Sequence, residues 1–350
     1  MILGFFKERR TTAVIRKFKE TQIITVVMTA SCQSVFPGRH NLSPATRATL
    51  TAVNVIVACS NIISNMFLVF ALRRTKQLKK VACQFILYLC ISDLCVGFLL
   101  QPLVSVLLTF FVSETDKECS IELTGQALSF IFPQISGVMI MIISLDRFLH
   151  MRFLNRYSTI MTHRRAMLLV ILNISLSAII TTCSVILSVY YRFFWFNVVL
   201  VSVDTLVVLL IYLFYTFTFQ SVHRHTEMLR KRTQNNSIKM ESQKKIHYLD
   251  LTLAKTMVFI LTSLTICYTP YFIVGLVWSY WKYYARVETS AFLDGLLWWC
   301  FILVYLNSTL NAVIFSFRNK SVRHVLYYFI QRRECISDQG DGRPSSTTEM

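Results

Sequence analysis

The chain has 350 residues, of which 54% are hydrophobic and only 15% are charged. Soluble domains carry about 25% charged residues, so this composition fits neither a disordered protein nor an ordinary soluble enzyme. Lysine and arginine outnumber aspartate and glutamate by 36 to 18, and long apolar blocks alternate with the charges. This pattern is typical of a polytopic membrane protein, whose basic excess marks cytoplasmic loops and contact with anionic membrane lipid rather than nucleic acid.

Residues 1–48 form a basic tail before the first apolar block. Three interpretations stay open: a signal peptide with its apolar run at residues 23–28, a translation start at Met28, and a plain disordered tail. The tail contains the sequon Asn41-Leu42-Ser43. If the tail is extracellular, Asn41 is predicted to be glycosylated.

Seven segments reach the roughly 20 apolar residues that a spanning helix needs. They are residues 49–72, 83–111, 121–149, 167–190, 196–220, 254–280 and 291–317. The sequence therefore predicts an all-α membrane protein with a seven-transmembrane helix bundle over residues 49–317. Basic residues fill alternate connectors, at 73–80, 147–165 and 224–245. Basic short loops lie in the cytoplasm, so we expect a multi-pass protein of the plasma membrane with its N-terminus extracellular.

The C-terminal region begins with residues 318–333, where basic and apolar residues alternate at near-helical spacing. This predicts a short amphipathic eighth helix on the membrane surface. Cys335 is a candidate palmitoylation site, with an unmodified thiol as the alternative. Residues 334–350 and the polar loop 221–253 are predicted to be flexible cytoplasmic segments. The last residues, Thr348-Glu349-Met350, fit a ligand of PDZ domains.

Asp93 is the most conspicuous polar residue within a predicted span, because its helix carries no basic residue. Polar residues in spanning helices are costly and are functional candidates. Asp93 must be neutralised, pair across helices or bind a cation, and a purely structural aspartate is the alternative. Its candidate oxygen partners are Asn65, Ser136, Asn307, Ser308 and Asn311. A transporter or channel would also use such an aspartate in an ion pathway, but no inverted repeat or pair of discontinuous helices is visible.

Several motifs follow one another on successive segments. They are Ser64-Asn65 on the first, Leu89 and Asp93 on the second, Asp146-Arg147-Phe148 at the end of the third, Cys267-Tyr268-Thr269-Pro270 on the sixth and Asn311-Ala312-Val313-Ile314-Phe315 on the seventh. Alone, an Asp-Arg pair at a membrane edge is usually a charge anchor. The order and spacing of the whole set, from Asn65 to Arg323, resemble the rhodopsin-like (class A) G-protein-coupled receptors.

The resemblance implies a receptor, not an enzyme, that activates a heterotrimeric G protein when an extracellular ligand drives helix six outward. Arrestin is a further implied partner. In such a receptor Arg147 would meet the G protein, with Asp146 beside it in the resting state. Asp250 would be the acidic end of a lock between helices three and six, and Tyr215 would support the active state.

The resemblance also implies an allosteric sodium pocket and a switch on helix six. Asp93, Ser136, Asn307, Ser308 and Asn311 match the sodium pocket, and no other metal or cofactor is expected. Cys267, Tyr268 and Pro270 match the switch, in which Pro270 kinks the helix.

Other positions depart from the family pattern. Phe148 and Tyr268 replace a tyrosine and a tryptophan, while Ala312 and Phe315 replace a proline and a tyrosine. Val207 stands where helix five usually has proline, and neither Gly137 nor Leu264 matches that proline's usual partners. Cys119 is displaced by three residues and the connector 191–195 has no cysteine, which argues against the usual disulfide. The short outer loop and the missing proline resemble the melanocortin, lysophospholipid, cannabinoid and adenosine receptors.

The predicted ligand cavity has six lining residues, with ordinary core packing as the alternative. They are Gln126, Ser129, Phe130, Tyr271, Trp298 and Tyr305. An amine receptor should carry an acid at Ser129 and an opsin a lysine at Tyr305, so both are disfavoured. An acidic rim would instead favour a basic peptide or an amine over a lipid. Its candidates are Glu114, Asp116, Glu118, Glu122 and Asp294.

Overall fold

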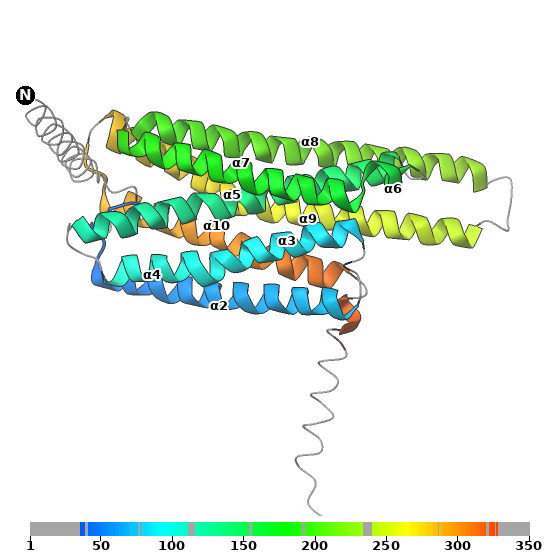
Figure 1. Ribbon diagram of the computed structural model, residues 1–350, viewed down its shortest axis with the longest axis horizontal. Helices are drawn as coiled ribbons and strands as arrows, with labels where there is room; N and C mark the ends of the chain where they lie inside the picture. The colour runs from blue at the N-terminus through cyan, green and yellow to red at the C-terminus, as the bar shows by residue number, and fades with distance from the viewer. Residues whose placement is uncertain are drawn as a thin grey trace, which may run out of the picture.

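The computed structural model describes residues 36–38, 41–75, 78, 80–110, 116–153, 156–190, 193–233, 240–285, 287–319, 322–325 and 327. Every regular element within these ranges is helical. The long helices run side by side as one bundle (Figure 1).

Seven long helical segments make the bundle. They are α2 (Pro44–Arg74), α3 (Val81–Cys95) continued by the π-helical turn η3 (Val96–Leu100) and by α4 (Gln101–Thr109), α5 (Asp116–Arg152), α7 (His163–Tyr190), α8 (Phe193–Thr233), α9 (Met240–Ser279) and α10 (Ala291–Arg318). The short helix α6 (Tyr157–Ile160) follows α5, and the π-helical turn η5 (Tyr280–Tyr284) follows α9. Among the described residues, six of the long segments are long and apolar enough to cross a membrane, and α8 contributes the shorter apolar stretch Thr205–Ser221.

Side-chain caps fix where two of the helices begin. Ser43 Oγ accepts a hydrogen bond from the Thr46 backbone N–H at 3.1 Å, directly before Pro44 in the first turn of α2. Ser290 Oγ accepts one from the Leu293 N–H at 3.2 Å at the start of α10. Both caps satisfy backbone donors that the first helical turn leaves unpaired.

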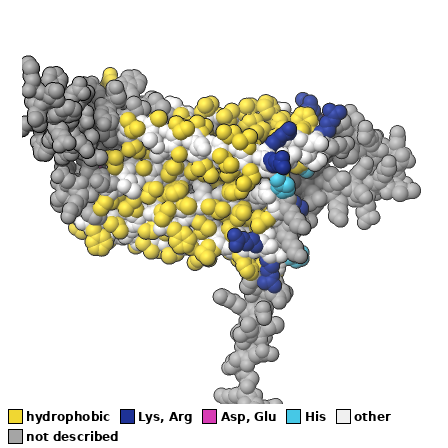
Figure 2. Space-filling model, viewed as in Figure 1, with side chains coloured by type: hydrophobic (Ala, Val, Ile, Leu, Met, Phe, Trp, Pro, Cys, Tyr) yellow, Lys and Arg dark blue, Asp and Glu magenta, His cyan; other side chains and the backbone are white. Residues whose placement is uncertain are grey.

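Helix α5 lies at the centre of the bundle, in contact with α3, α7 and α8. Around it, α10 packs on both α2 and α9, and α9 packs on α8. The face of the bundle seen in Figure 2 is largely apolar between its two ends. On α7 the residues Leu168, Leu172, Leu176 and Ile179 are exposed at a spacing of three or four, which marks a continuous face toward lipid.

Two large clusters of buried apolar side chains lie in the interior, beside a small one around Trp278. The first large cluster contains Leu68, Met139 and Tyr215, and the second contains Phe36, Trp298 and Tyr305. Tyr268 of α9 packs against both clusters. It therefore lies where the two halves of the core meet.

Between α3 and α4 the chain departs from regular α-helix. A π-helical turn at η3 precedes Pro102, which stands in the first turn of α4. Within η3, a Cβ atom on Gly97 would lie 2.8 Å from Ile62 Cγ1. Only glycine allows α2 and η3 to approach this closely.

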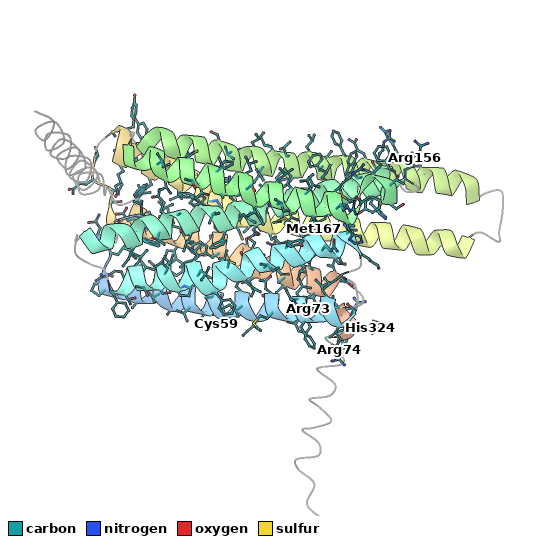
Figure 3. All side chains as sticks on the ribbon, viewed as in Figure 1. Cys59, Arg73, Arg74, Arg156, Met167 and His324 are labelled. Carbon is teal, nitrogen blue, oxygen red and sulfur yellow. The ribbon has the colours of Figure 1, made fainter. Side chains whose placement is uncertain are left out.

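Basic side chains gather at one end of the bundle (Figure 2). Arg73, Arg74, Arg156 and His324 lie at this end (Figure 3). The described residues of the connectors predicted to be cytoplasmic lie here, whereas α2 and α10 begin at the opposite end (Figure 1). We call these the basic end and the outer end.

The prediction of a flexible segment at 221–253 is wrong for most of its length. Helix α8 continues to Thr233 and α9 begins at Met240, because lysine, arginine, glutamine, methionine and leucine are strong helix formers even where hydropathy falls. Residues 322–325 are helical, but most of 318–333 and all of 334–350 lie outside the described residues. The eighth helix, the Cys335 palmitoylation and the PDZ ligand remain predictions.

Candidate functional site

A polar cluster surrounds Asp93 in the middle of the bundle, where its side chain is fully buried. Ser136 Oγ of α5 donates to Asp93 Oδ1 at 2.9 Å, and Asn311 Nδ2 of α10 is 3.4 Å from Oδ2. Ser308 of α10 also makes a hydrogen bond with the carboxyl group. The structure thus brings four of the five predicted pocket residues into contact, across three helices.

The fifth predicted residue, Asn307, is buried one helical turn from Asn311. Neither Asn307 Oδ1 nor Asn311 Oδ1 has a hydrogen-bond partner among the described residues. Together with the Asp93 carboxylate and the serine hydroxyls, these atoms are oxygen donors of the kind that hard cations prefer. The residues present therefore fit a small hard cation such as sodium.

The predicted partner Asn65 belongs to a row of buried amides on α2, and sequence reasoning missed the other two, Asn54 and Asn61. Asn54, Asn61 and Asn65 are fully buried, and their spacing of seven and four residues places them on one helical face. Asn61 Nδ2 donates to the backbone carbonyl of Asp93 at 2.7 Å, and Asn65 Nδ2 donates to that of Ser308 at 3.2 Å. The spacing of the amides within an apolar block was the signal that would have revealed this face.

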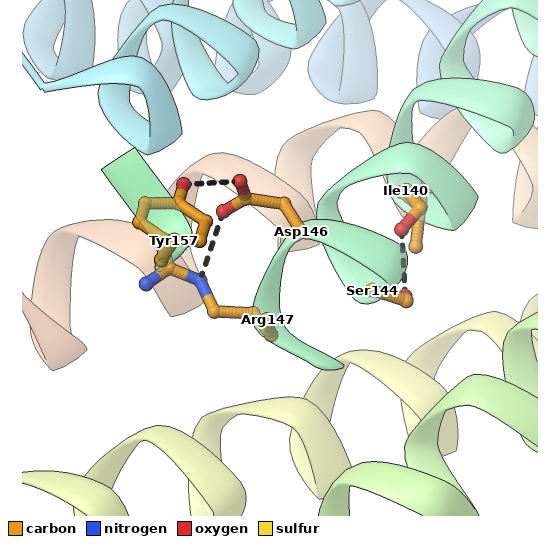
Figure 4. Close-up of polar contacts among 5 residues, drawn as sticks. All are labelled: Ile140, Ser144, Asp146, Arg147 and Tyr157. Atoms are coloured by element: carbon orange, nitrogen blue, oxygen red, sulfur yellow. Dashed lines mark hydrogen bonds and ion pairs between the residues drawn. The ribbon is translucent and has the colours of Figure 1, made fainter. Parts of the chain in front are cut away.

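At the basic end, the Asp146 side chain has a partner that the sequence did not suggest. The Tyr157 hydroxyl of α6 donates to Asp146 Oδ1 at 2.5 Å, while Arg147 Nε lies 3.9 Å from Asp146 Oδ2 (Figure 4). Asp146 is 1% exposed and Arg147 is 18% exposed. Burial and the hydrogen bond to Asp146 raise the pKa of Tyr157 well above its ordinary value, so the phenol remains a donor at physiological pH.

Two further residues were predicted for this end. Tyr215 of α8 is buried near Ser144 of α5, whose hydroxyl donates to the Ile140 carbonyl at 2.7 Å (Figure 4). Asp250 lies on α9, but its side chain is outside the described residues. The predicted lock between Arg147 and Asp250 is therefore untested.

The predicted switch residues lie in the membrane-spanning part of α9. Cys267 is buried, Tyr268 is half-buried, and Pro270 stands inside the helix. The hydroxyls of Tyr212 on α8 and Thr265 on α9 form a hydrogen bond one turn before the switch. Helices α8 and α9 are therefore tied together directly below Tyr268.

Two adjoining cavities lie toward the outer end and share Ser129, Phe130, Tyr271 and Phe301. The outer cavity is also lined by Gln126, and the inner cavity by Tyr305. Five of the six predicted cavity residues thus line these spaces. Trp298 lines neither of these two cavities, because its ring is fully buried and stacked against Phe36, and its role in a ligand cavity stays a prediction.

Residues 36–38 and 41–43, which we call the outer strap, cross the mouth of the bundle. The Phe36 ring stacks on Trp298 with centroids 5.3 Å apart and an interplanar angle of 9°. Asn41 Nδ2 donates to Asp294 Oδ2 at 3.0 Å and to the Thr289 carbonyl at 3.4 Å. A glycan would replace one of the two hydrogens on this same nitrogen, so a glycosylated Asn41 could keep at most one of these two hydrogen bonds.

Asp294 is the anchor of the strap and not part of an acidic rim. It is fully buried, and its Oδ1 accepts hydrogen bonds from Trp278 Nε1 at 2.7 Å and Thr289 Oγ1 at 2.8 Å. Glu122 is buried too, and the side chains of the other three candidates are outside the described residues. The rim prediction is therefore wrong for Asp294 and Glu122.

The chain matches the family model described as 7 transmembrane receptor (rhodopsin family) over residues 64–194 and 181–315. The chain belongs to this family. The match confirms both the predicted seven-helix bundle and the class A resemblance. The family is one of membrane receptors and not of enzymes.

Its relatives include cannabinoid receptors. Cannabinoid receptor 1 of Xenopus laevis is 23% identical over 310 residues, which cover 81% of this chain and 63% of that protein. Cannabinoid receptor type 1B of Takifugu rubripes is 30% identical over 142 residues, covering 38% of this chain and 28% of that protein. The chain thus spans less than two thirds of the length of these relatives, and its place near the cannabinoid branch is confirmed.

Proposed function

We propose that this rhodopsin-family receptor converts binding of an extracellular ligand in its outer cavities into activation of a heterotrimeric G protein at the basic end. The observation that carries the proposal is the state of Arg147. Its neighbour Asp146 is engaged by Tyr157, and the ion pair that Arg147 makes among the described residues is a contact of 3.9 Å. A cation that cannot lose its proton is thus presented at the proposed cytoplasmic edge with a long contact to its acidic neighbour.

Helix α9 supplies the mechanical link in this proposal. Its Tyr268 borders the inner cavity, and Pro270, which lacks a backbone N–H, weakens the helix two residues later. Outward movement of the cytoplasmic part of α9 would open a binding surface beside Arg147. The ligand must bind this arrangement better than the resting one, because only differential affinity shifts a population. Asp250 on α9 would oppose the movement by pairing with Arg147.

The Asp93 cluster is the proposed allosteric sodium site. When bound, sodium would supply a positive charge that neutralises Asp93, with Ser136, Ser308, Asn307 and Asn311 providing further oxygens. The ion would favour the resting arrangement, because it links α3, α5 and α10 at one point.

The proposed location is the plasma membrane, with the outer strap facing the extracellular side and the basic end facing cytoplasmic anionic lipid. Arrestin and PDZ-domain proteins remain proposed partners. The names of the relatives make cannabinoids the first compounds to screen. The alternative of a transporter or channel that uses Asp93 loses support, because the matched family consists of receptors.

The test of this function is the Arg147→Ala variant, assayed for nucleotide exchange on purified G proteins with the receptor in lipid nanodiscs. We expect at least a tenfold loss of exchange at unchanged surface expression. Arg152→Ala is the matched control, because Arg152 is an exposed arginine in the last turn of the same helix. Normal exchange by Arg147→Ala would reduce the Asp146-Arg147 pair to a charge anchor and refute the proposal.

A further inference from the structure

The floor of the inner cavity is an apolar space between α5, α8 and α9. Gly137, Val207, Ile211, Leu264 and Tyr268 line it. Gly137, Val207 and Leu264 are three of the positions at which the sequence departs from the family pattern. These three departures, together with Tyr268, therefore meet around one space in the structure.

Gly137 leaves this space open without any packing reason. A Cβ atom added there would meet nothing within 4 Å, whereas a Cβ on Gly97 or Gly125 would come within 2.8 or 3.1 Å of a neighbouring side chain. Protein interiors are close-packed, and an unfilled cavity is destabilising. A cavity whose glycine is not required by a close helix approach points to an occupant.

The lining defines the chemistry of that occupant. Carboxylate and ammonium groups are absent from the described residues that line the two cavities, and burying an unpaired charge there would be costly. Apart from the hydroxyl of Tyr268, the side chains named for the floor are apolar. Among the described residues, Gln134 Oε1 is buried without a hydrogen-bond partner beside the inner cavity, and both amide atoms of Gln126 are buried without one beside the outer cavity.

We propose that the floor of the inner cavity binds the apolar end of an uncharged, elongated ligand, with Gly137 setting the depth to which that ligand enters. The hydrogen-bonding end of the ligand then lies at Gln126 and Gln134. The apolar end contacts Tyr268 directly, two residues before Pro270. This proposal depends on the proposed function in one respect: it takes the occupant of the cavity to be the ligand of the receptor.

The test uses 1-alkanols of 8 to 18 carbons with a diazirine on the last carbon, photolysed with the full-length receptor in nanodiscs and mapped by mass spectrometry. We expect the longer alkanols to label the floor residues Val207, Ile211, Leu264 and Tyr268. Gly137→Leu should reduce this labelling at least tenfold, with Gly137→Ala and Gly137→Val giving graded losses if the leucine variant fails to fold. Labelling of the lipid-facing residues Leu168 and Leu172 should stay unchanged.

Ser175→Leu is the matched control, because it adds a similar side chain to the exposed face of α7. It should leave labelling of the inner cavity as in the wild type. Labelling confined to lipid-facing residues, or labelling of the floor that does not change across the Gly137 series, would overturn the proposal. The readout requires no G protein, so a receptor that binds the alkanols but fails to signal would contradict the proposed function and not the subsite.

Discussion

Tyr157 makes the tightest contact at the basic end, although it is eleven residues from Asp146 in the chain. The contact restrains Asp146 on α5 by a residue of the following short helix. It leaves Arg147 as the less firmly held member of the pair. The resting state of this end therefore depends on a phenol as well as on an ion pair.

We predict that Tyr157→Phe raises ligand-independent nucleotide exchange a few-fold. The change removes one hydrogen bond, worth about 1 kcal/mol, and about 1.4 kcal/mol is needed for a tenfold shift. Tyr88→Phe is the control, since the Tyr88 hydroxyl contacts Met167 and not Asp146. Unchanged basal exchange in Tyr157→Phe would show that the contact does not restrain activation.

The Tyr157 contact should also be insensitive to pH over the physiological range. Its pKa is raised in the folded state, so its contribution to stability is fully present below the ordinary phenol pKa of about 10 and is lost only as pH rises through the folded value. Basal exchange of wild type and Tyr157→Phe should accordingly keep the same ratio between pH 6 and 8.

Asp93 carries the prediction for the sodium site. Replacing N-methylglucamine by sodium at constant ionic strength should raise the melting temperature of the purified receptor, and Asp93→Asn should abolish this difference. Ser92→Ala is the control, because Ser92 donates to the Phe132 carbonyl and not to the carboxylate. A wild-type receptor without sodium dependence would assign Asp93 a purely structural role.

The sequence predicted the members of the Asp93 cluster but not their support. A carboxylate in an apolar helix is conspicuous, and the family resemblance named its partners. Asn61 was missed because it bonds to the backbone carbonyl of Asp93 and not to its side chain. Every residue has a backbone carbonyl, so such an acceptor cannot be recognised from the residue type. Tyr157 was missed because a contact between residues eleven apart, on two different helices, is not visible in the hydropathy pattern.

At the scale of elements, helix α10 begins at a junction that Asp294 holds together. Its carboxylate receives donors from Trp278 of α9, from Thr289 and from Asn41 of the strap. One side chain thus joins the ends of two spanning helices to the segment that crosses the mouth. This arrangement replaces the exposed acidic rim that composition suggested.

We predict that Asp294→Ala lowers the thermal stability of the receptor by about 1–3 kcal/mol, since it leaves buried donors unsatisfied. Asp294→Asn should lose less, because an amide oxygen still accepts from one or two of the donors. Differential scanning fluorimetry of the purified variants would show both losses of stability as lower melting temperatures. Equal stability of Asp294→Ala and wild type would show that the junction is not structurally important.

Helix positions could be predicted from hydropathy, but helix lengths could not. The apolar blocks mark where each helix lies in the membrane, whereas α8 and α9 continue beyond it as polar helix to Thr233 and from Met240. Hydropathy indicates which residues contact lipid, but it does not indicate helix propensity in water. Hydropathy also does not reveal cavities. Gly137 was therefore recognised from the sequence only as a departure from the family pattern and not as part of a cavity floor.

At the scale of the whole molecule, the two ends differ in charge and in what they bind. Basic residues collect at one end (Figures 2 and 3), and the outer cavity is lined by Phe36 of the strap toward the other. The positive-inside rule assigns the basic end to the cytoplasm.

We predict that an epitope tag after Met350 is reached by antibody only in permeabilised cells, whereas a tag inserted before Phe36 is reached in intact cells. The odd number of spanning helices requires this difference. Surface staining of a C-terminal tag in intact cells would contradict the seven-span topology.

We predict that the strap slows ligand exchange through the outer end. Phe36 lines the outer cavity while stacked on Trp298, so a ligand that passes Phe36 has to displace this stack. Binding that waits for a conformational change has a lowered association rate, and exit through the same opening is slowed as well. Exchange should therefore be faster in both directions in Phe36→Ala, and binding assays with brief incubation would underestimate the affinity of the wild-type receptor.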